Sequence, residues 1–368
     1  MSDLQPRNHS WQLHCPISIP GDSEVITLSH GEGGRLMRRL IHDHIISAFH
    51  TMPSDSQEAR HNEPLLLMDD AARLPAIDGA IAVSTDSFVV SPLFFPGGDI
   101  GSLAVYGTVN DLAVSGARPL YLTLSLIIEE GFPITLLDHV LKSVSKAARQ
   151  TAVQIVAGDT KVVPRHAVDG LFINTAGIGQ LVDPVAPGPK ALCDGDQLIV
   201  TGPIGQHGIA VLCAREELAL EPPPQSDCAP LVHVIDVLRD RMGTRVRAMR
   251  DATRGGVAAV LHEWAGESKQ TLTINECDIP VSPQVRGACE LLGLDPLHVA
   301  NEGTMVLAVE SGYADAAVEV LRSLPEFVDA TLIGSVTPKG ISPVTIFRTL
   351  GPEQPLDDPL GAPLPRIC

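Results

Sequence analysis

A proline-rich segment near the middle of the chain places the strongest constraint on its fold. Residues 183–190 read Asp-Pro-Val-Ala-Pro-Gly-Pro-Lys, with three prolines and one glycine. Proline lacks an amide hydrogen and disfavours helix at the residue before it, so neither a helix nor a central strand can run through this stretch. Patterns typical of strands and helices lie on both sides of it. We therefore predict a boundary between two domains here.

Both blocks mix strands with helices. Before the boundary we predict strands at 81–90, 121–128, 153–157 and 171–176 and helices at 35–50, 100–115 and 134–150. After it we predict strands at 197–201, 304–309 and 331–335 and helices at 208–219, 256–265 and 283–292. This mixed order is typical of α+β domains and not of a doubly wound nucleotide fold. The predicted units are an N-terminal extension (1–25), a first domain (26–182), a second domain (191–348) and a tail (349–368).

Composition limits the classes of partner. With 368 residues, 44% of them hydrophobic and 19% charged, the chain is globular and long enough for two cores. A net charge of -18 argues against nucleic acid and against anionic membranes as partners. It leaves room for an anionic nucleotide, because Mg²⁺ can bridge carboxylates and phosphates. The most apolar stretch, 119–128, is too short to span a bilayer.

The cysteines indicate a reducing compartment. There are seven, an odd number, with no C-x-x-C pair and no zinc-type spacing. No signal peptide is visible, so we expect a cytoplasmic protein with free thiols. The seventh cysteine, Cys368, is the last residue of a proline-punctuated tail. Extended geometry of about 3.1 Å per residue would let residues 351–368 carry this thiol about 50 Å. Taken alone, the tail favours an incidental cysteine over a reactive one.

Five segments place aspartates in predicted turns. They are residues 68–72, 84–87, 109–111, 157–161 and 250–256. Any one of them alone indicates a cap or a turn. Five together, two of them with a nearby Lys161 or Arg254, favour a site for Mg²⁺ and phosphate, because Mg²⁺ prefers oxygen ligands.

Glycine-rich pieces point the same way. Residues 30–34, 97–99 and 255–256 open predicted helices, whose first amides favour phosphate. Each could equally be a tight turn. Neither G-x-x-x-x-G-K-[ST] nor G-x-G-x-x-G occurs in the chain.

Three further side chains are candidates for chemistry, each with a structural alternative. Lys161 follows Gly-Asp-Thr after a buried strand and is either a phosphate contact or tuned base, or an ordinary surface lysine. His262 lacks the second histidine of H-E-x-x-H, so zinc is not expected and a structural histidine is the alternative. Glu302 precedes a strand and is either a site carboxylate or part of a turn.

In combination, the motifs resemble the HypE family, the carbamoyl dehydratases of [NiFe]-hydrogenase maturation. The matching segments are 30–34, 84–87, 94–101, 107–116, 129–131, 158–163, 251–256, 301–303 and 365–368. The terminal Pro-Arg-Ile-Cys together with Gly-Asp-Thr-Lys-Val-Val is highly specific. The wider superfamily includes aminoimidazole ribonucleotide synthetase, thiamine monophosphate kinase and selenophosphate synthetase. Selenophosphate synthetases carry a reactive cysteine or selenocysteine near the N-terminal glycine-rich loop, whereas residues 30–35 have none.

The resemblance implies a two-domain PurM-like architecture. It implies an N-terminal α/β domain that dimerises and binds ATP, a C-terminal α+β domain, and a flexible tail carrying Cys368. It also implies that the carbamoyltransferase HypF loads a carbamoyl group on this cysteine. ATP-dependent dehydration would turn that group into a thiocyanate, and cyanide would pass to iron on the HypC–HypD complex.

Residue roles are carried over by position in the matching motifs. We assign metal and phosphate contacts to Asp70, Asp86, Asp111 and Asp251. The wider nucleotide-binding set adds Asn110, Asp159, Thr160, Gly255 and Gly256. The candidates for catalysis are Cys368, Lys161 and Glu302, with His262 as a third candidate for proton transfer. Two alternatives remain: an ATP-dependent small-molecule kinase or synthetase of the same superfamily, and a non-catalytic thiol carrier.

Overall fold

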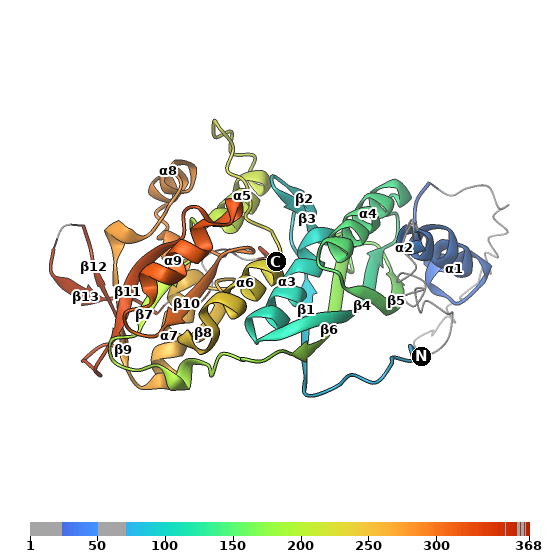
Figure 1. The fold of residues 1–368 in the computed structure, drawn as a ribbon. Coiled ribbons are helices and arrows are strands. Elements are labelled where there is room, and N and C mark those ends of the chain that lie inside the picture. The colour runs from blue at the N-terminus through green and yellow to red at the C-terminus, as the bar shows by residue number, and fades with distance from the viewer. Residues whose placement is uncertain (1–23, 51–70, 350, 359–360, 362–363, 365) are drawn as a thin grey trace, which may run out of the picture.

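The structure is a computed structural model that describes residues 24–50, 71–349, 351–358, 361, 364 and 366–368. Two mixed α+β halves lie side by side, and the C-terminus lies between them (Figure 1). This is the two-domain arrangement that the sequence predicts. No helix in the described part of the chain is both long and apolar enough to cross a membrane.

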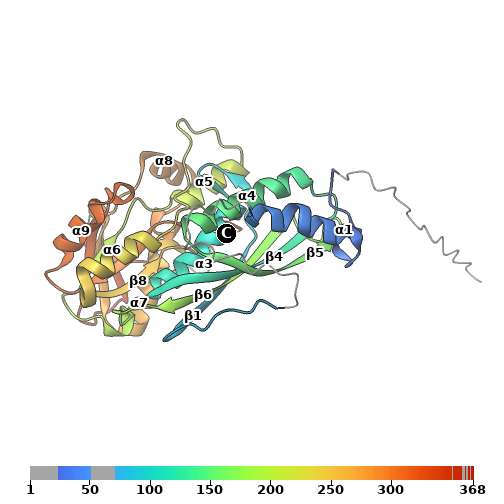
Figure 2. The same ribbon diagram turned by 45° about the vertical axis from the view of Figure 1, so that its right-hand side comes forward.

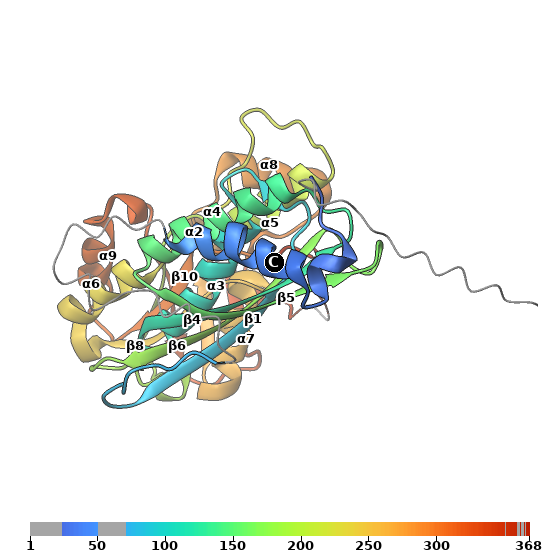
Figure 3. The same ribbon diagram turned by 90° about the vertical axis from the view of Figure 1, so that its right-hand side faces the viewer.

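The first half is built on a four-stranded sheet in the order β1-β6-β4-β5. The strands are β1 (Ile81–Phe88), β4 (Ala117–Glu129), β5 (Gln154–Val163) and β6 (Leu171–Leu181). Strands β4 and β5 are parallel and the other neighbours antiparallel. Helices α3 (Ile100–Val114) and α4 (Ile134–Gln150) cover one face of the sheet (Figures 2 and 3). Before them come β2 (Phe94–Phe95), β3 (Gly98–Asp99), and a continuous helical run of α1 (Arg35–Leu40), the π-helix η2 (Ile41–Ile46) and α2 (Ser47–His50).

Helix α3 begins at Ile100, as the sequence predicts, directly after Asp99. The Asp99 carboxylate accepts the amides of Gly101 and Ser102 at 2.8 and 3.1 Å, so it is the N-cap. In the sequence, the apolar residues between Ile100 and Ala113 recur at a spacing that predicts a single apolar face for this helix. Instead the helix is buried on nearly every side, because it lies between the first sheet and the second half. Leu103 packs into the core of the first half and Ala113 into that of the second.

Within the described part of the chain, the other face of the first sheet carries exposed side chains and is called the open face below. Along β1 the side chains alternate, and the exposed ones include Ile81 at 52% and Val83 at 66%. Ile127 on β4 faces the same way and is also exposed. Apolar side chains on an uncovered sheet face are typical of a surface that packs against another molecule.

The second half is a seven-stranded sheet in the order β13-β12-β9-β11-β7-β10-β8. Its strands are β7 (Gln197–Val200), β8 (Val246–Asp251), β9 (Thr271–Asn275), β10 (Met305–Val309), β11 (Thr331–Thr337), β12 (Val344–Phe347) and β13 (Glu353–Pro355). Its helices are α5 (Gln206–Arg215), α6 (Val232–Met242), α7 (Gly256–Ser268), α8 (Pro283–Leu292) and α9 (Ala314–Arg322). Short 3-10 helices lie at Leu28–Gly31, Pro189–Ala191, Gly243–Arg245, Glu276–Asp278, Pro296–His298 and Pro325–Phe327. Six of these elements are not predicted from the sequence: α6, α9, β8, β9, β12 and β13.

Three of the five predicted aspartate turns are wrong. Residues 84–87 lie inside β1 and 109–111 inside α3, in agreement with the predicted strand 81–90 and helix 100–115, and 157–161 lie inside β5. Gly-Asp-Thr-Lys is typical of a turn, but pairing with residues 124–127 of β4 holds it in a strand. Only the segment around Asp251 turns, directly after β8. In the remaining segment, residues 68–70, which include Asp70, lie outside the described residues.

The tail is anchored at both ends of its described part. Strand β13 pairs with β12, and Leu356 is buried at 3% exposure. At the other end Ile367 is buried at 5% exposure in the core of the first half. The fully extended arm predicted from the prolines is therefore not the pose in this structure.

Candidate active site

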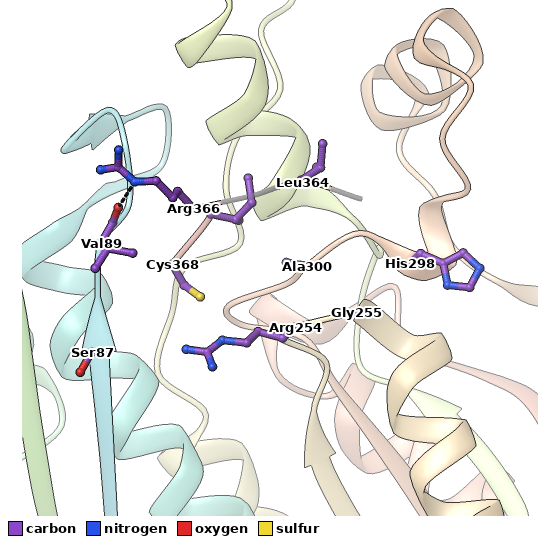
Figure 4. A pocket seen from close by; sticks show the side chains of 10 residues that line it. Ser87, Val89, Arg254, Gly255, His298, Ala300, Leu364, Arg366 and Cys368 are labelled. Carbon is purple, nitrogen blue, oxygen red and sulfur yellow. Dashed lines mark hydrogen bonds between the residues drawn. The ribbon is translucent and has the colours of Figure 1, made fainter. Parts of the chain in front are cut away.

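A cavity of about 240 Å³ lies between the two halves, beside the last residue of the chain (Figure 4). The first half contributes Ser87 and Val89, at and after the end of β1. The second half and the tail contribute Arg254, Gly255, His298, Ala300, Leu364, Arg366, Ile367 and Cys368. Figure 4 shows the sulfur of Cys368 and the guanidinium of Arg254 on neighbouring sides of this gap. The cavity therefore joins the terminal thiol to residues of both halves.

Four predicted carboxylates lie close enough to interact with one another, and two of them, Glu302 and Asp86, also act on this thiol. Asp86 comes from β1 and Asp111 from α3, and Ser84 donates a hydrogen bond to Asp111 at 2.7 Å. Asp251 ends β8 and Glu302 precedes β10, and both are buried, at 5% and 3% exposure. Burial and nearby carboxylates disfavour the ionised forms of Asp86, Asp251 and Glu302. The cluster is thus assembled from two strand ends, a helix and a loop that are far apart in sequence.

The pKa values show how strongly these groups interact. Burial and the charge of Asp111 raise the pKa of Asp86 to about 6. Burial, followed by Asp111, raises the pKa of Asp251 to about 7. Burial and the neighbouring Asp251 raise the pKa of Glu302 well above its usual value. Groups titrating close to neutral pH are typical of sites that bind cations or transfer protons.

The donor set fits a magnesium ion shared with phosphate. The described residues contain no cluster of three or more His, Cys, Asp and Glu side chains arranged to hold a metal by themselves. Mg²⁺ is commonly held by one or two carboxylates and completed by water and phosphate oxygens. The mutual repulsion that raises the pKa of Asp86 and Asp251 is what a bound divalent cation would relieve.

The surroundings of Cys368 act on the pKa of its thiol in opposite directions. Burial and the charge of Glu302 raise the pKa of its thiol, while a hydrogen bond and the charge of Arg254 lower it. The net direction is upward, so the neutral thiol is favoured. Arg254 is not among the site residues assigned from the sequence.

The turn that presents Arg254 requires two consecutive glycines. Gly255 and Gly256 have φ values of +74° and +62°, which side chains rarely adopt. A Cβ on Gly256 would lie 2.5 Å from the carbonyl oxygen of Leu297 and 2.6 Å from that of Val299. The glycine pair thus lets the start of α7 sit directly against the segment that lines the cavity.

Lys161 and Asp159 lie elsewhere in the chain. Both are exposed on the open face of β5, with Nζ and Oδ1 3.6 Å apart. Strand β5 and strand β1, which carries Ser87, are the two edges of the sheet. Strand β5 is separated from β1 by three strand spacings, or about 14 Å, which is beyond the reach of a lysine side chain. Within one chain, Lys161 therefore does not meet Cys368.

Three other assigned residues have different surroundings. Thr160 is buried and points to the helix-covered side of β5, away from Asp159. Asn110 accepts the amide of Leu231 and donates to the carbonyls of Ala229 and Glu302, so it joins the two halves. His262 lies on α7, and its buried Nε2 has no hydrogen-bond partner among the described residues.

Besides Arg254, two further residues of the site, Asp227 and His207, are absent from the sequence-based assignment. Asp227 accepts the amides of Glu302 and Gly303 at 3.1 and 3.0 Å, which fixes the loop that carries the Glu302 carboxylate. His207, fully buried at the start of α5, bonds to the main chain of the tail at Ile367. Both precede their partners by many residues, and only the folded chain brings them together.

Comparison with known proteins gives a consistent answer. Residues 68–181 match the family model of the AIR synthase related protein, N-terminal domain, and residues 194–346 that of the C-terminal domain. The carbamoyl dehydratase HypE of Escherichia coli K12 is 47% identical over 344 residues, covering 93% of this chain and 99% of that protein.

Two solved structures are similar over most of the chain. A crystal structure of the hydrogenase maturation protein HypE in complex with ATP is 41% identical with a TM-score of 0.82, covering 93% of this chain and 99% of that one. A HypE–HypF complex contains a chain that is 44% identical with a TM-score of 0.73, covering 89% of this chain and 100% of that one. With this identity over nearly the full length, the chain belongs to the HypE family of carbamoyl dehydratases, within the AIR synthase related proteins.

Proposed function

We propose that this protein uses ATP to dehydrate an S-carbamoyl group on its own Cys368, giving a thiocyanate whose cyanide serves [NiFe]-hydrogenase maturation. The observation that carries the proposal is the terminal thiol held in the cavity beside Arg254 and Glu302. A kinase or synthetase for a free small molecule would have no use for this docked thiol. A passive carrier would have no use for the carboxylates that act on this thiol.

The chemistry explains the need for ATP. Loss of water from S–C(=O)–NH₂ is unfavourable because oxide is a poor leaving group. Transfer of the γ-phosphoryl group of ATP to the carbamoyl oxygen lets that oxygen leave with phosphate instead. The two N–H protons leave as the C≡N bond forms. The products are thiocyanate on sulfur, ADP and phosphate.

The residues of this chain have distinct roles in that reaction. Glu302 is buried with a raised pKa and lies close to Cys368, so it is our candidate for taking a proton from nitrogen. Arg254 donates a hydrogen bond to the sulfur of Cys368 and can stabilise negative charge that develops on the carbamoyl group. Asp86, Asp111 and Asp251 would hold Mg²⁺, which when bound neutralises charge on the phosphates.

Lys161 requires a second copy of the chain. The open face of the first sheet carries Ile81, Val83 and Ile127, which supports a homodimer formed through this face. Lys161 and Asp159 lie on the same face. We therefore place Lys161 of one copy at the site of the other.

Partners follow from the same proposal. A relative in the HypE–HypF structure is bound to HypF, so we expect HypF to load the carbamoyl group. We expect the HypC–HypD complex to receive cyanide. Each cysteine in the described part of the chain is free, which suits a reaction in the cytoplasm.

Intact mass spectrometry tests the proposal. The protein is incubated with HypF, carbamoyl phosphate and ATP, with and without Mg²⁺. We expect a carbamoyl adduct, followed by loss of water that depends on ATP and Mg²⁺. Cys368→Ala should show neither step, and Cys193→Ala, which removes an exposed cysteine, should show both. An unchanged mass with active HypF would reject the proposal, and turnover of a free substrate after deletion of residues 366–368 would favour the kinase alternative.

A further inference from the structure

The last three residues are held chiefly through their main chain. The carbonyl of Ile367 accepts a hydrogen bond from Nε2 of His207 at 2.9 Å. The carbonyl of Arg366 accepts one from a terminal nitrogen of Arg215. Both donors belong to helix α5, near its first and last residues. A single helix therefore holds two successive carbonyls of the tail.

The hydrogen bonds of His207 define its tautomer. A carbonyl can only accept, so Nε2 of His207 carries the hydrogen that bonds Ile367. Nδ1 is then bare and accepts from the hydroxyl of Ser226 at 2.8 Å. The ring also packs edge-on against Phe95, with centroids 5.3 Å apart. The contacts with Ser226 and Phe95 fix the ring in one orientation before the tail arrives.

Arg215 joins the tail to the first half. Besides the Arg366 carbonyl, its Nε donates to the carbonyl of Ser91 at 2.8 Å. Arg366 in turn donates to the carbonyl of Val89 at 3.2 Å and pairs with Asp169 at 3.1 Å. The terminal segment is thus held from both sides of the cavity.

Burial of Ile367 and His207 favours the docked pose of the tail over an undocked one. Ile367 is 5% exposed and packs in the core of the first half, next to Cys368. If the tail leaves, the buried N–H of His207 loses its protein acceptor, and an unsatisfied buried donor is costly. Nothing in these contacts depends on the Cys368 side chain itself.

We infer that His207 and Arg215 are positioning residues that fix the docked tail through two main-chain carbonyls and so place the sulfur of Cys368 beside Arg254 and Glu302. The inference rests on the proposed function for its purpose. It is tested without turnover, because the docked pose governs how readily an external reagent reaches Cys368.

The test is the alkylation rate of Cys368, followed by peptide mass spectrometry on the full-length protein with N-ethylmaleimide. The side-chain nitrogen of glutamine can replace Nε2 of histidine, whereas that of asparagine corresponds to Nδ1. We expect His207→Asn to raise the alkylation rate roughly tenfold, because the loss of one hydrogen bond shifts the docking equilibrium by about this factor. His207→Gln should stay within about threefold of the parent, because it keeps the hydrogen bond. Arg215→Ala should also raise the rate roughly tenfold, and Arg215→Lys less.

Internal references separate docking from unfolding. Cys193 and Cys277 are exposed and should react equally in every variant. Cys213 and Cys289 are buried and should stay protected in any variant that is folded. Arg241→Ala, an exposed arginine of α6, is the matched control for Arg215→Ala.

Each outcome decides the inference. Faster alkylation of Cys368 alone in His207→Asn and Arg215→Ala, with rescue by the conservative variants, supports it even if no dehydration is ever observed. Equal rates in folded His207→Asn, Arg215→Ala and parent protein would overturn it, and the proposed function would then still stand on its own mass experiment. If His207→Asn fails to fold, the rates of Arg215→Ala and Arg215→Lys decide between the two outcomes.

Discussion

Some residues at the cavity lower the stability of the fold and are explained by the reaction that they serve. Glu302 is the clearest case, because a carboxylate buried among Asp251, Asp227 and Asp86 cannot be there for stability. Burial and the neighbouring carboxylates raise its pKa, so its ionised form is a stronger base than an ordinary glutamate.

Replacing Glu302 by glutamine should separate loading from dehydration. Glu302→Gln keeps the shape of the side chain but cannot accept a proton. We expect carbamoylation by HypF to continue and dehydration to slow on the order of 100-fold or more, the usual contribution of a general base. Single-turnover mass measurements on the loaded protein give the rate. Glu290→Gln, an exposed glutamate of α8, should react like the parent, and undiminished dehydration in Glu302→Gln would remove this residue from the mechanism.

Asp251 should make the protein less stable as the pH rises. Its pKa is raised from 3.8 to about 7, so folding favours the protonated form. That stabilisation is complete below pH 3.8 and is lost as the pH rises through about 7. The elevation corresponds to about 4 kcal/mol as an upper figure.

Asp251→Asn removes this charge without changing shape. We expect the variant and the parent to unfold alike near pH 4, and the variant to be the more stable by up to about 4 kcal/mol at pH 8, measured in urea. ATP binding should weaken at the same time. Asp240→Asn, exposed on α6, should show no such pH dependence. A constant difference across this range would mean that neither burial nor the neighbouring carboxylates raise the pKa of Asp251 in the folded protein.

We expect the thiol of Cys368 to be no more reactive than an ordinary cysteine, with Arg254 limiting the rise of its pKa. Burial and Glu302 raise its pKa, and Arg254 opposes them. The alkylation rate against pH should therefore have a midpoint above that of free cysteine. Arg254→Met should move it higher still, because only the raising influences remain. A midpoint below that of a free thiol in the parent would contradict this account.

Much of the site is predictable at this scale, but not all of it. Asp86, Asp111, Asp251, Glu302 and Cys368 lie in compact motifs that can be singled out in the sequence, and the folded chain brings these five residues together. His207 and Asp227 act on main-chain groups of Ile367, Glu302 and Gly303. Such contacts impose no residue pattern on the sequence, and no motif could have indicated them.

Helices and strands are predictable where one local property dominates. Helix α4 runs from Ile134 to Gln150, the residues predicted, because its apolar positions repeat regularly along one face. Helix α9 and strands β9 and β12 are short and escape prediction, since few residues carry their periodicity. The strand β5 is predicted to end at 157, and it continues to Val163 because β4 pairs with it throughout.

Strand β5 depends on one glycine at this point. A Cβ on Gly158 would lie 2.4 Å from the carbonyl oxygen of Leu124 on β4, so any side chain there would separate the strands. We expect Gly158→Ala to lower the free energy of unfolding by about 2 kcal/mol or more. Gly266→Ala is the control, since nothing lies within 4 Å and its helical position should gain about 0.5–1 kcal/mol. Equal urea midpoints for Gly158→Ala and the parent would show that the sheet accommodates the extra carbon.

The whole molecule is incomplete as a single copy if Lys161 takes part in the reaction. Lys161→Ala and Cys368→Ala should each be inactive alone. Mixed after partial unfolding and refolding, random pairing makes half the dimers mixed, and one site in each of these combines both intact residues, so about a quarter of sites should recover. Dehydration measured by mass gives the recovery. No recovery in verified mixed dimers would mean that Lys161 serves its own chain or none.

The burial of Leu356 also sets the length of the tether on which Cys368 moves. Only residues 357–368 lie beyond this anchor, a span of about 37 Å when extended. A reactive group on so short a tether experiences its own docking site at an effective concentration in the millimolar range. An acceptor in solution must therefore outcompete a tethered occupant, and affinity for the thiol alone would not suffice. Loading and unloading of Cys368 thus require partners that also bind the body of the protein within the reach of this tether.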